Sequence, residues 1–205
     1  MSSGIDKERL AEKVKEAFTI QADALTHQLD RLKRAELVRT AEMLVDAPVI
    51  GASACGHSGI ACMHFAHLMC CVGKAARFIS PAEAVHGGLG FLQPGGIILL
   101  ASRGGRTAEL APVQDYCKEN HIKTIVVSEN AGSLLAKDAD MVLLMTVTRE
   151  IDRNNCQGTT SFLVMSAIFE VLQMLMIEIM DFSDQRFAEI HPGGAVGERL
   201  RGERA

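Results

Sequence analysis

Apolar and polar positions recur in two different ways along the chain. From Asp6 to Ala47 the sequence contains no proline or glycine, and leucine, valine, alanine and phenylalanine recur every three or four positions. This spacing predicts one long helix or two, with an apolar stripe that needs a partner surface. Because the stripe precedes the first predicted strand, it either covers the sheet or packs against another subunit.

From Pro48 onward, short apolar segments alternate with helical segments. Five short segments, several of them rich in valine and isoleucine, have the composition of strands buried on both faces. They are Val49–Ala52, Ala75–Ile79, Ile97–Ala101, Thr124–Val127 and Met141–Val147. The helical segments are His57–Val72, Ala82–Val85, Ala108–Asn120, Leu134–Asp138 and Thr160–Met180. This alternation predicts an α/β fold with a doubly wound, five-stranded parallel sheet and right-handed crossovers.

The length of 205 residues suits a single domain that spans residues 1–205. Its N-terminal helices cover about residues 6–47 and its α/β core about residues 48–201. The formal charge of -4 and the lack of a basic cluster argue against a nucleic-acid partner. No apolar run reaches the roughly 18 residues of a membrane span. Val164–Met180 comes nearest, and Glu170 and Glu178 interrupt it, so no membrane partner is predicted.

The six cysteines lie mostly inside apolar runs and show no paired CxxC spacing. Neither a disulfide framework nor a zinc ribbon is indicated, and reduced cysteines favour a cytoplasmic protein. Cys55, His57, Cys62, His64 and His67 do crowd one segment. A structural metal site there is the less favoured alternative, because cysteines in such runs usually behave as small buried hydrophobic residues. We therefore predict no metal.

Three loops that follow predicted strands are rich in glycine and serine. They read SACGHSG over residues 53–59, SRGGRT over residues 102–107 and SENAGS over residues 128–133. The carboxyl ends of parallel strands share one edge of the sheet, where small residues, hydroxyls and helix N-termini can surround an anion. Arg103 and Arg106 add positive charge. The loops predict a phosphate site, and the lack of Walker and GxGxxG motifs argues against nucleotides.

The segment EIHPGGAVGERL, residues 189–200, places His191 beside a Pro-Gly-Gly turn at the end of the long apolar helix. Proline and glycine build a defined backbone turn, which can hold the imidazole in one place. A histidine held in this way is a proton carrier near pH 7. The alternative is a helix-capping turn with an exposed imidazole.

Four segments in this order, ACGHSG, EAVHGGLG, SRGGRTAEL and HPGGAVGERL, resemble the sugar isomerase (SIS) domain family. Within that family the chain is most similar to the short form of the arabinose-5-phosphate isomerase group, without CBS repeats. The resemblance covers about residues 35–201 and implies a flavodoxin-like fold. It implies conversion of a phosphorylated monosaccharide from aldose to ketose through an enediol, without any cofactor. It also implies a homodimer or homotetramer with sites at subunit interfaces.

The resemblance also implies particular site residues. Those that bind the phosphate or the sugar are His57, Ser58, Ser102, Arg103, Arg106 and Thr107. The catalytic set is His86, Glu109, Glu150 and His191. Glu150 and His191 are expected to move protons at carbon, whereas His86 and Glu109 serve ring opening or hold the substrate. Hydroxyls of residues 159–161 are expected to cap the long helix.

Three positions depart from the family pattern: His57 replaces a lysine, Gly88 an aspartate and Gly104 a serine. The clustering of these departures favours a shifted sugar specificity. The resemblance itself implies arabinose 5-phosphate and ribulose 5-phosphate as the substrate and product. Two alternatives stay open, a noncatalytic phosphosugar sensor and a 6-phospho-3-hexuloisomerase-like enzyme. Structural roles also stay open for Glu109, which suits a helix N-terminus, and for Glu150 as a solvated loop charge.

Overall fold

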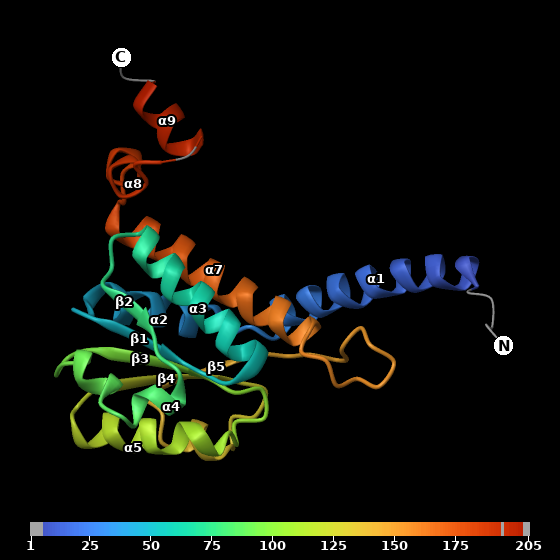
Figure 1. Ribbon diagram of the computed structural model, residues 1–205, viewed down its shortest axis with the longest axis horizontal. Helices are drawn as coiled ribbons and strands as arrows, with labels where there is room; N and C mark the ends of the chain where they lie inside the picture. Colours follow the sequence, from blue (N-terminus) through green and yellow to red (C-terminus); the bar gives the residue numbers. More distant parts are fainter. Residues whose placement is uncertain (1–5, 194, 203–205) are drawn as a thin grey trace.

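A computed structural model describes residues 6–193 and 195–202 of the chain. Figure 1 shows a sheet enclosed by helices, with one long helix extending to one side and two short helices standing apart. The predicted single domain over residues 1–205 stays a prediction. Residues 1–5, 194 and 203–205 of that range lie outside the described part.

The sheet has the predicted doubly wound, flavodoxin-like form. Its strands are β1 (Ile50–Ser53), β2 (Ala76–Phe78), β3 (Ile97–Ala101), β4 (Lys123–Ser128) and β5 (Met141–Leu144). All neighbouring strands are parallel, in the order β2-β1-β3-β4-β5. The chain order reverses between β1 and β3, and ligands of such sheets bind beyond the carboxyl ends of the strands near that point.

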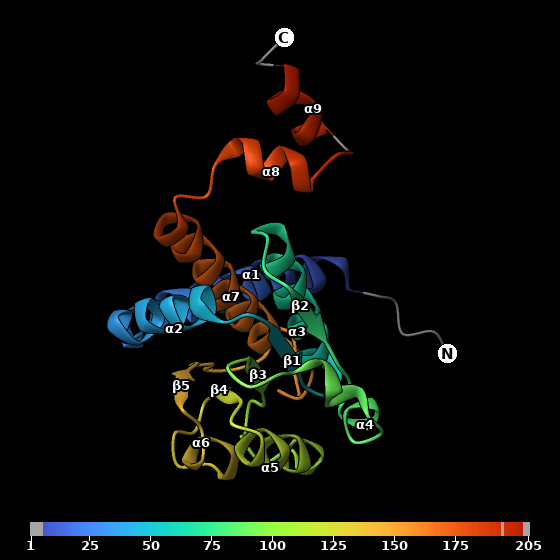
Figure 2. The same cartoon turned by 90° about the vertical axis from the view of Figure 1, so that its left-hand side faces the viewer.

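Helices cover both faces of the sheet (Figure 2). One face carries α1 (Lys7–Arg31), α2 (Arg34–Asp46), α3 (Gly56–Cys71) and α7 (Thr160–Met180). The other carries α4 (Pro81–Ala84), α5 (Ala111–Glu119), α6 (Leu134–Lys137) and the short 3₁₀ turns η1 (Gly88–Phe91) and η2 (Ala108–Leu110). Within β3, Leu99 packs into the first layer and Ile98 into the second. This two-sided burial explains why the strands are apolar throughout instead of alternating.

The N-terminal apolar pattern forms two helices, which separate at residues 32–33. Near the end of α1 the buried Gln28 amide donates to the Leu144 carbonyl at 2.9 Å and accepts from the Thr146 amide at 2.6 Å. The Gln28 side chain thus satisfies two backbone groups at the outer edge of β5, where no further strand of the described part of the chain pairs with them. The predicted strand Met141–Val147 was therefore too long, because β5 ends at Leu144.

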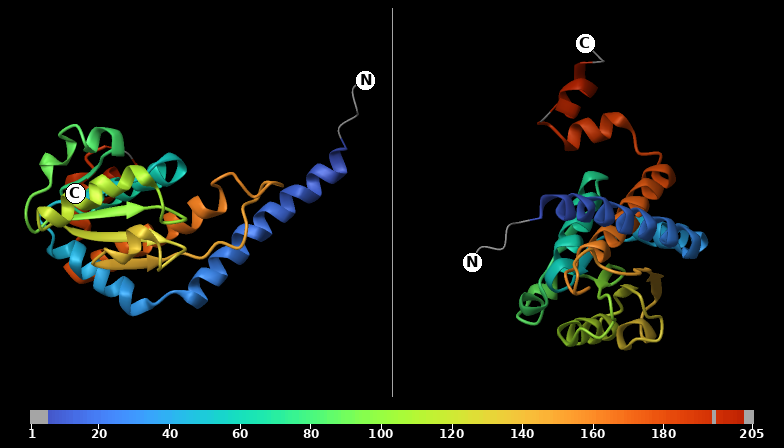
Figure 3. Two further views of the ribbon diagram at one scale, coloured as in Figure 1. Left: turned by 90° about the horizontal axis from the view of Figure 1, so that it is seen from below. Right: turned by 90° about the vertical axis from the view of Figure 1, so that its right-hand side faces the viewer.

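The first part of α1 extends away from the sheet (Figure 3). Large apolar side chains are exposed along the whole helix: Leu10, Val14 and Phe18 in its first half, and Leu25 and Leu29 near its end. The stripe that the sequence predicted is thus only partly used within the chain. The part of the stripe on α2 is buried, with Leu37, Ala41 and Leu44 in the core, and most of the part on α1 is available for another surface.

The apolar helix α7 has the predicted bounds and packs against α2 and α3. Among the described helices it alone has the length and composition to cross a membrane, and its buried side chains belong to the first core layer. The prediction that His191 follows this helix directly was wrong. Asp181 adopts a left-handed conformation with φ 48°, and a separate helix α8 (Asp184–Ile190) leads to His191, followed by α9 (Ala195–Gly202).

Candidate functional site

The loops after four strands pack against one another at the carboxyl edge of the sheet. We call these loops, residues 54–58, 102–110, 128–133 and 145–159, the rim. Gly105 has φ +67°, and a Cβ there would overlap the Ser133 hydroxyl, so only glycine lets the second loop lie on the third. A Cβ on Gly158 would lie 3.0 Å from the Cβ of His57, so the fourth loop lies on the first. The predicted convergence of the loops is therefore present.

Two of the predicted phosphate ligands are in direct contact. The hydroxyls of Ser102 and Thr107 lie 2.8 Å apart across the turn after β3. Ser58 is partly exposed in the first turn of α3, and His57 and Arg106 are exposed. Two predicted phosphate ligands therefore form a hydroxyl pair, and Ser58, His57 and Arg106 lie at the same carboxyl edge of the sheet.

Glu150 is the buried carboxylate of the rim, with 1% of its surface exposed. Its Oε2 atom accepts hydrogen bonds from the Thr159 amide at 2.9 Å, the Thr159 hydroxyl at 3.1 Å and the Ser161 amide at 3.1 Å. Its Oε1 atom accepts from Nη1 of Arg103 at 2.6 Å. Glu150 is therefore not a solvated loop charge.

Glu150 also caps helix α7, a role that the sequence assigned to the hydroxyls of residues 159–161. Thr159 is the N-cap residue of α7, and its side chain makes no capping hydrogen bond. The carboxylate replaces it because an anion is favoured by the amide groups and the positive end of the helix dipole. The expected hydroxyl cap was wrong for this reason.

The pKa of Glu150 lies below its ordinary value. Burial by itself raises the pKa, because it penalises the charged form. Hydrogen bonds from Ser161 and Thr159 and the charge of Arg103 act in the opposite direction and outweigh burial. The rim therefore holds an ionised carboxylate at neutral pH.

Arg103 lies between two carboxylates. Its Nε atom donates to Oε2 of Glu129 at 2.7 Å, while Nη1 donates to Glu150. Oε1 of Glu129 accepts from the Val147 amide at 3.0 Å, and the Glu129 amide donates to the Arg103 carbonyl at 2.9 Å. Sequence reasoning missed Glu129, although its place directly after a buried strand at the ligand-binding edge was a usable signal.

Glu109 and His86 lie on neighbouring turns. Glu109 is exposed in η2, and burial together with the Glu109 charge raises the pKa of the Cys55 thiol in the first loop. His86 is exposed in the turn after α4, and α4 packs against η2. Glu109 therefore lies in the second rim loop next to the first, and His86 lies on a turn whose helix packs against that loop.

His191 lies far from the rim of its own chain. Its ring stacks on Phe187 at 3.9 Å, and its Nε2 atom lies 3.3 Å from Sγ of Cys71. Cys71 ends the 16-residue helix α3, whose first turn holds Ser58. At about 1.5 Å per residue, the two ends of α3 are more than about 20 Å apart. The HPGG segment includes residue 194, which lies outside the described residues.

The environment of His191 fixes its tautomer. Nδ1 lies 3.0 Å from the Phe187 carbonyl oxygen, which can only accept a hydrogen bond. Nδ1 therefore carries the proton of the neutral ring, and Nε2 is the basic nitrogen.

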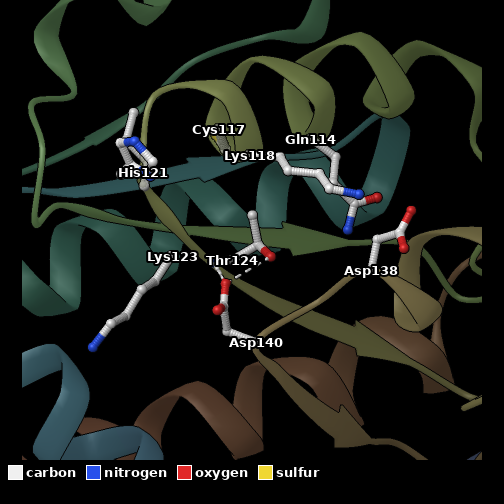
Figure 4. A pocket seen from close by; sticks show the side chains of 9 residues that line it. Gln114, Cys117, Lys118, His121, Lys123, Thr124, Asp138 and Asp140 are labelled. Carbon is white, nitrogen blue, oxygen red and sulfur yellow. Dashed lines mark hydrogen bonds between the residues drawn. The ribbon is translucent and has the colours of Figure 1, made fainter.

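A cavity of about 340 Å³ lies at the opposite, amino edge of the sheet, where β4 begins (Figure 4). Asp140 in this cavity accepts a hydrogen bond from the Thr124 amide at 2.7 Å. The cavity contains none of the predicted site residues. It is lined by Gln114, Cys117, Lys118, His121, Ile122, Lys123, Thr124, Asp138 and Asp140.

Comparison with known proteins shows the family of the chain. The SIS domain family model matches residues 43–177, and the chain belongs to this family. The resemblance inferred from the four sequence segments is therefore confirmed.

Two curated relatives carry related names. The chain is 38% identical over 145 residues to a Haemophilus influenzae protein named "Probable arabinose 5-phosphate isomerase", covering 71% of this chain and 43% of that protein. It is 32% identical over 200 residues to arabinose 5-phosphate isomerase KpsF of Escherichia coli, covering 97% of this chain and 61% of KpsF. The chain thus spans about half the length of these relatives.

A solved structure covers nearly the whole fold. The crystal structure of a candidate sugar-phosphate isomerase from Listeria monocytogenes superposes with a TM-score of 0.89 at 32% identity. The match covers 93% of this chain and 100% of that chain. The architecture described above is therefore also that of an experimentally solved protein.

Proposed function

We propose that this protein is a phosphosugar isomerase that interconverts an aldose phosphate and its ketose phosphate. Arabinose 5-phosphate and ribulose 5-phosphate are the proposed pair, which the names of relatives at 38% and 32% identity support. The observation that carries the proposal is the buried, ionised Glu150 carboxylate among hydroxyl-bearing loops at the rim. Isomerisation requires a fixed base that removes a proton from carbon, and a held carboxylate can act as one.

The proposed reaction moves one proton between neighbouring carbons. Glu150 removes the proton from C2 of the open-chain aldose, and the resulting enediol takes a proton back at C1. A second group moves a proton from the oxygen on C2 to the oxygen on C1, which completes the ketose. Nε2 of His191 is assigned to this second step because the ring proton lies on Nδ1, and its present contact with Sγ of Cys71 at 3.3 Å must be exchanged for the substrate. This route includes no metal or organic cofactor.

The substrate phosphate is proposed to lie on the second rim loop. Ser102 and Thr107 supply paired hydroxyls, and Ser58 adds one at the start of α3. The amide groups and dipole of the 16-residue helix α3 favour a dianion there. His57 and Arg106 are exposed beside these groups and are proposed to contribute charge.

The remaining catalytic candidates lie beside this phosphate site. Glu109 and His86 lie on adjacent turns, where their side chains are exposed. We assign them to ring opening or to the sugar hydroxyls. This assignment keeps the carbon chemistry with Glu150 and His191.

We further propose a homodimer or homotetramer in which one copy supplies His191 to the rim of another. His191 lies near the far end of α3 from the rim of its own chain, so its participation requires a second copy. The exposed apolar stripe of α1 offers a surface for such an assembly, with Phe18 72% exposed. We place the protein in the cytoplasm, which suits its six free thiols.

One observation favours a second candidate, a noncatalytic module that binds a phosphosugar and reports on it. The Glu150 carboxylate is sealed from solvent and already caps α7, which is also what a purely structural residue would do. Catalytic contacts often form only when substrate binds, so this geometry does not remove Glu150 from the reaction.

Turnover separates the two candidates. The whole protein is incubated with arabinose 5-phosphate, and ribulose 5-phosphate is measured, with 3-hexulose 6-phosphate and other phosphosugars as a panel. We expect turnover that the Glu150→Gln variant lowers by about 10²–10⁴-fold, the usual contribution of a general base. Binding of phosphosugars without turnover of any of them would instead establish the sensor.

A further inference from the structure

The guanidinium of Arg103 is committed to two carboxylates of the rim. It contacts Glu129 through Nε at 2.7 Å and Glu150 through Nη1 at 2.6 Å. Its backbone carbonyl accepts hydrogen bonds from the Glu129 amide at 2.9 Å and from the Ser128 hydroxyl at 3.0 Å. Arg103 thus joins the loops after β3, β4 and β5, and two of its five N–H donors are placed on carboxylates.

The two oxygens of Glu150 have different capacities left. Oε2 accepts three hydrogen bonds, from the amide and hydroxyl of Thr159 and the amide of Ser161. Oε1 accepts one, from Arg103. Because an ionised carboxylate offers about four lone-pair sites over its two oxygens, Oε1 is the atom with room for a proton.

We propose that Arg103 is a positioning residue that holds the Glu150 carboxylate ionised and keeps Oε1 as the atom that receives the substrate proton. The main role of Arg103 is then to position Glu150, and the hydroxyls and Arg106 carry most of the phosphate binding. This inference rests on the proposed isomerase function and assigns it a further residue. A planar guanidinium suits the role because its separate N–H groups reach two carboxylates in fixed directions.

The charged surroundings of Glu150 make the proposal specific. Within the described residues, Arg103 faces its carboxylate and Glu129 lies behind Arg103. Arg149 contacts only the backbone oxygen of Glu150, at 3.4 Å, and its guanidinium lies 3.6 Å from Glu16. Asp152 is engaged by backbone amides of its own loop. Arg103 is thus the cation in direct contact with the Glu150 side chain.

The test compares the pH dependence of kcat and KM for Arg103→Met, Arg103→Lys and Arg106→Met with the unchanged protein. Loss of an adjacent opposite charge shifts a carboxylate by about 1–3 pH units. Hydrogen bonds from Ser161 and Thr159 remain in Arg103→Met and lower the pKa of Glu150 more than the Arg103 charge does. We therefore expect Arg103→Met to move the acid limb of kcat upward by about one unit at most, with KM changed less than about threefold. Arg103→Lys keeps the charge, so we expect its acid limb to lie close to that of the unchanged protein. Arg106→Met, which removes the same charge from the same loop, raises KM and leaves the acid limb in place.

A second readout needs no turnover and covers the case in which the proposed isomerase function fails. In ¹³C NMR, the side-chain carboxyl of Glu150 is followed by pH titration in the unchanged protein and in both Arg103 variants. We expect Arg103→Met to titrate at higher pH and Arg103→Lys to titrate near the unchanged protein. Arg103→Gln, which also removes the charge, replaces Arg103→Met if that variant fails to fold by circular dichroism. An acid limb or a Glu150 titration that stays unshifted in the charge-removing variant would overturn the proposal.

Discussion

Replacement of Glu150 tests whether the rim depends on its buried carboxylate. Glu150→Ala removes the acceptor of four contacts, the Arg103 ion pair and three hydrogen bonds from Thr159 and Ser161. Removing one partner of a buried ion pair costs about 3–5 kcal/mol, because the other charge stays buried without a counterion. Arg103 retains Glu129 and part of its solvent contact, so we expect the lower end, about 3 kcal/mol. Glu150→Gln keeps one carbonyl acceptor and should cost about 1–3 kcal/mol.

The assay is thermal and urea unfolding of both variants at one protein concentration. For a chain of this length each kcal/mol lowers Tm by about 2–4 °C, so Glu150→Ala should lower it by about 6–12 °C. Glu109→Gln is the matched control, because Glu109 is an exposed carboxylate of the same rim and its loss should stay within about 0.5 kcal/mol. A Glu150→Ala variant as stable as the control would refute the reasoning, since the ion pair and the helix cap would then contribute nothing measurable.

The remaining predictions concern the pH dependence of stability, the edge strand and the rim backbone. The pKa of Glu150 is lowered in the folded protein, so its carboxylate stabilises the fold at every pH above its unfolded pKa. This stabilisation is lost as the pH falls through the folded pKa. Urea unfolding from pH 7 to pH 3 should show the loss of stability, and Glu150→Gln should reduce that loss. Gln28→Ala should lower the free energy of unfolding by about 1–3 kcal/mol and speed hydrogen exchange at the Thr146 amide, and unchanged exchange would contradict the role of Gln28 at the strand edge. Gly105→Ala should lower the free energy of unfolding by about 1–3 kcal/mol, because a φ of +67° is strained for alanine and the new Cβ would overlap Ser133. If the overlap contributes, Ser133→Gly in the double mutant should recover part of the lost stability.

Periodicity and composition predict most of the fold. Strands such as β3 are recognisable because both faces are buried, which removes polar residues from the run. The bounds of α7 are recoverable because the apolar run of this helix is long and ends before a turn. The hydrogen bonds along the outer edge of β5 were not predictable, since Gln28 lies 116 positions away from Leu144.

The candidate site is predictable only to the level of loops. The Ser102–Thr107 pair lies within one short turn, so local sequence identifies it. The contact of Arg103 with Glu150 spans 47 positions and joins two loops whose packing is a tertiary property. In the sequence, an arginine beside a glycine-rich loop looks like a phosphate ligand. Only the fold shows that Arg103 forms ion pairs with Glu129 and Glu150. The position of His191 likewise depends on a short helix, α8, that the sequence pattern merged with the run before it.

Hydrogen exchange at C2 of the sugar distinguishes proton transfer by Glu150 from mere binding. Arabinose 5-phosphate is incubated with the whole protein in D₂O and followed by NMR. We expect ribulose 5-phosphate that carries deuterium at C1 and recovered arabinose 5-phosphate that carries deuterium at C2, with both signals lost in Glu150→Gln. Bound sugar that neither isomerises nor exchanges hydrogen at C2, or exchange that survives in Glu150→Gln, would show that Glu150 is not the base.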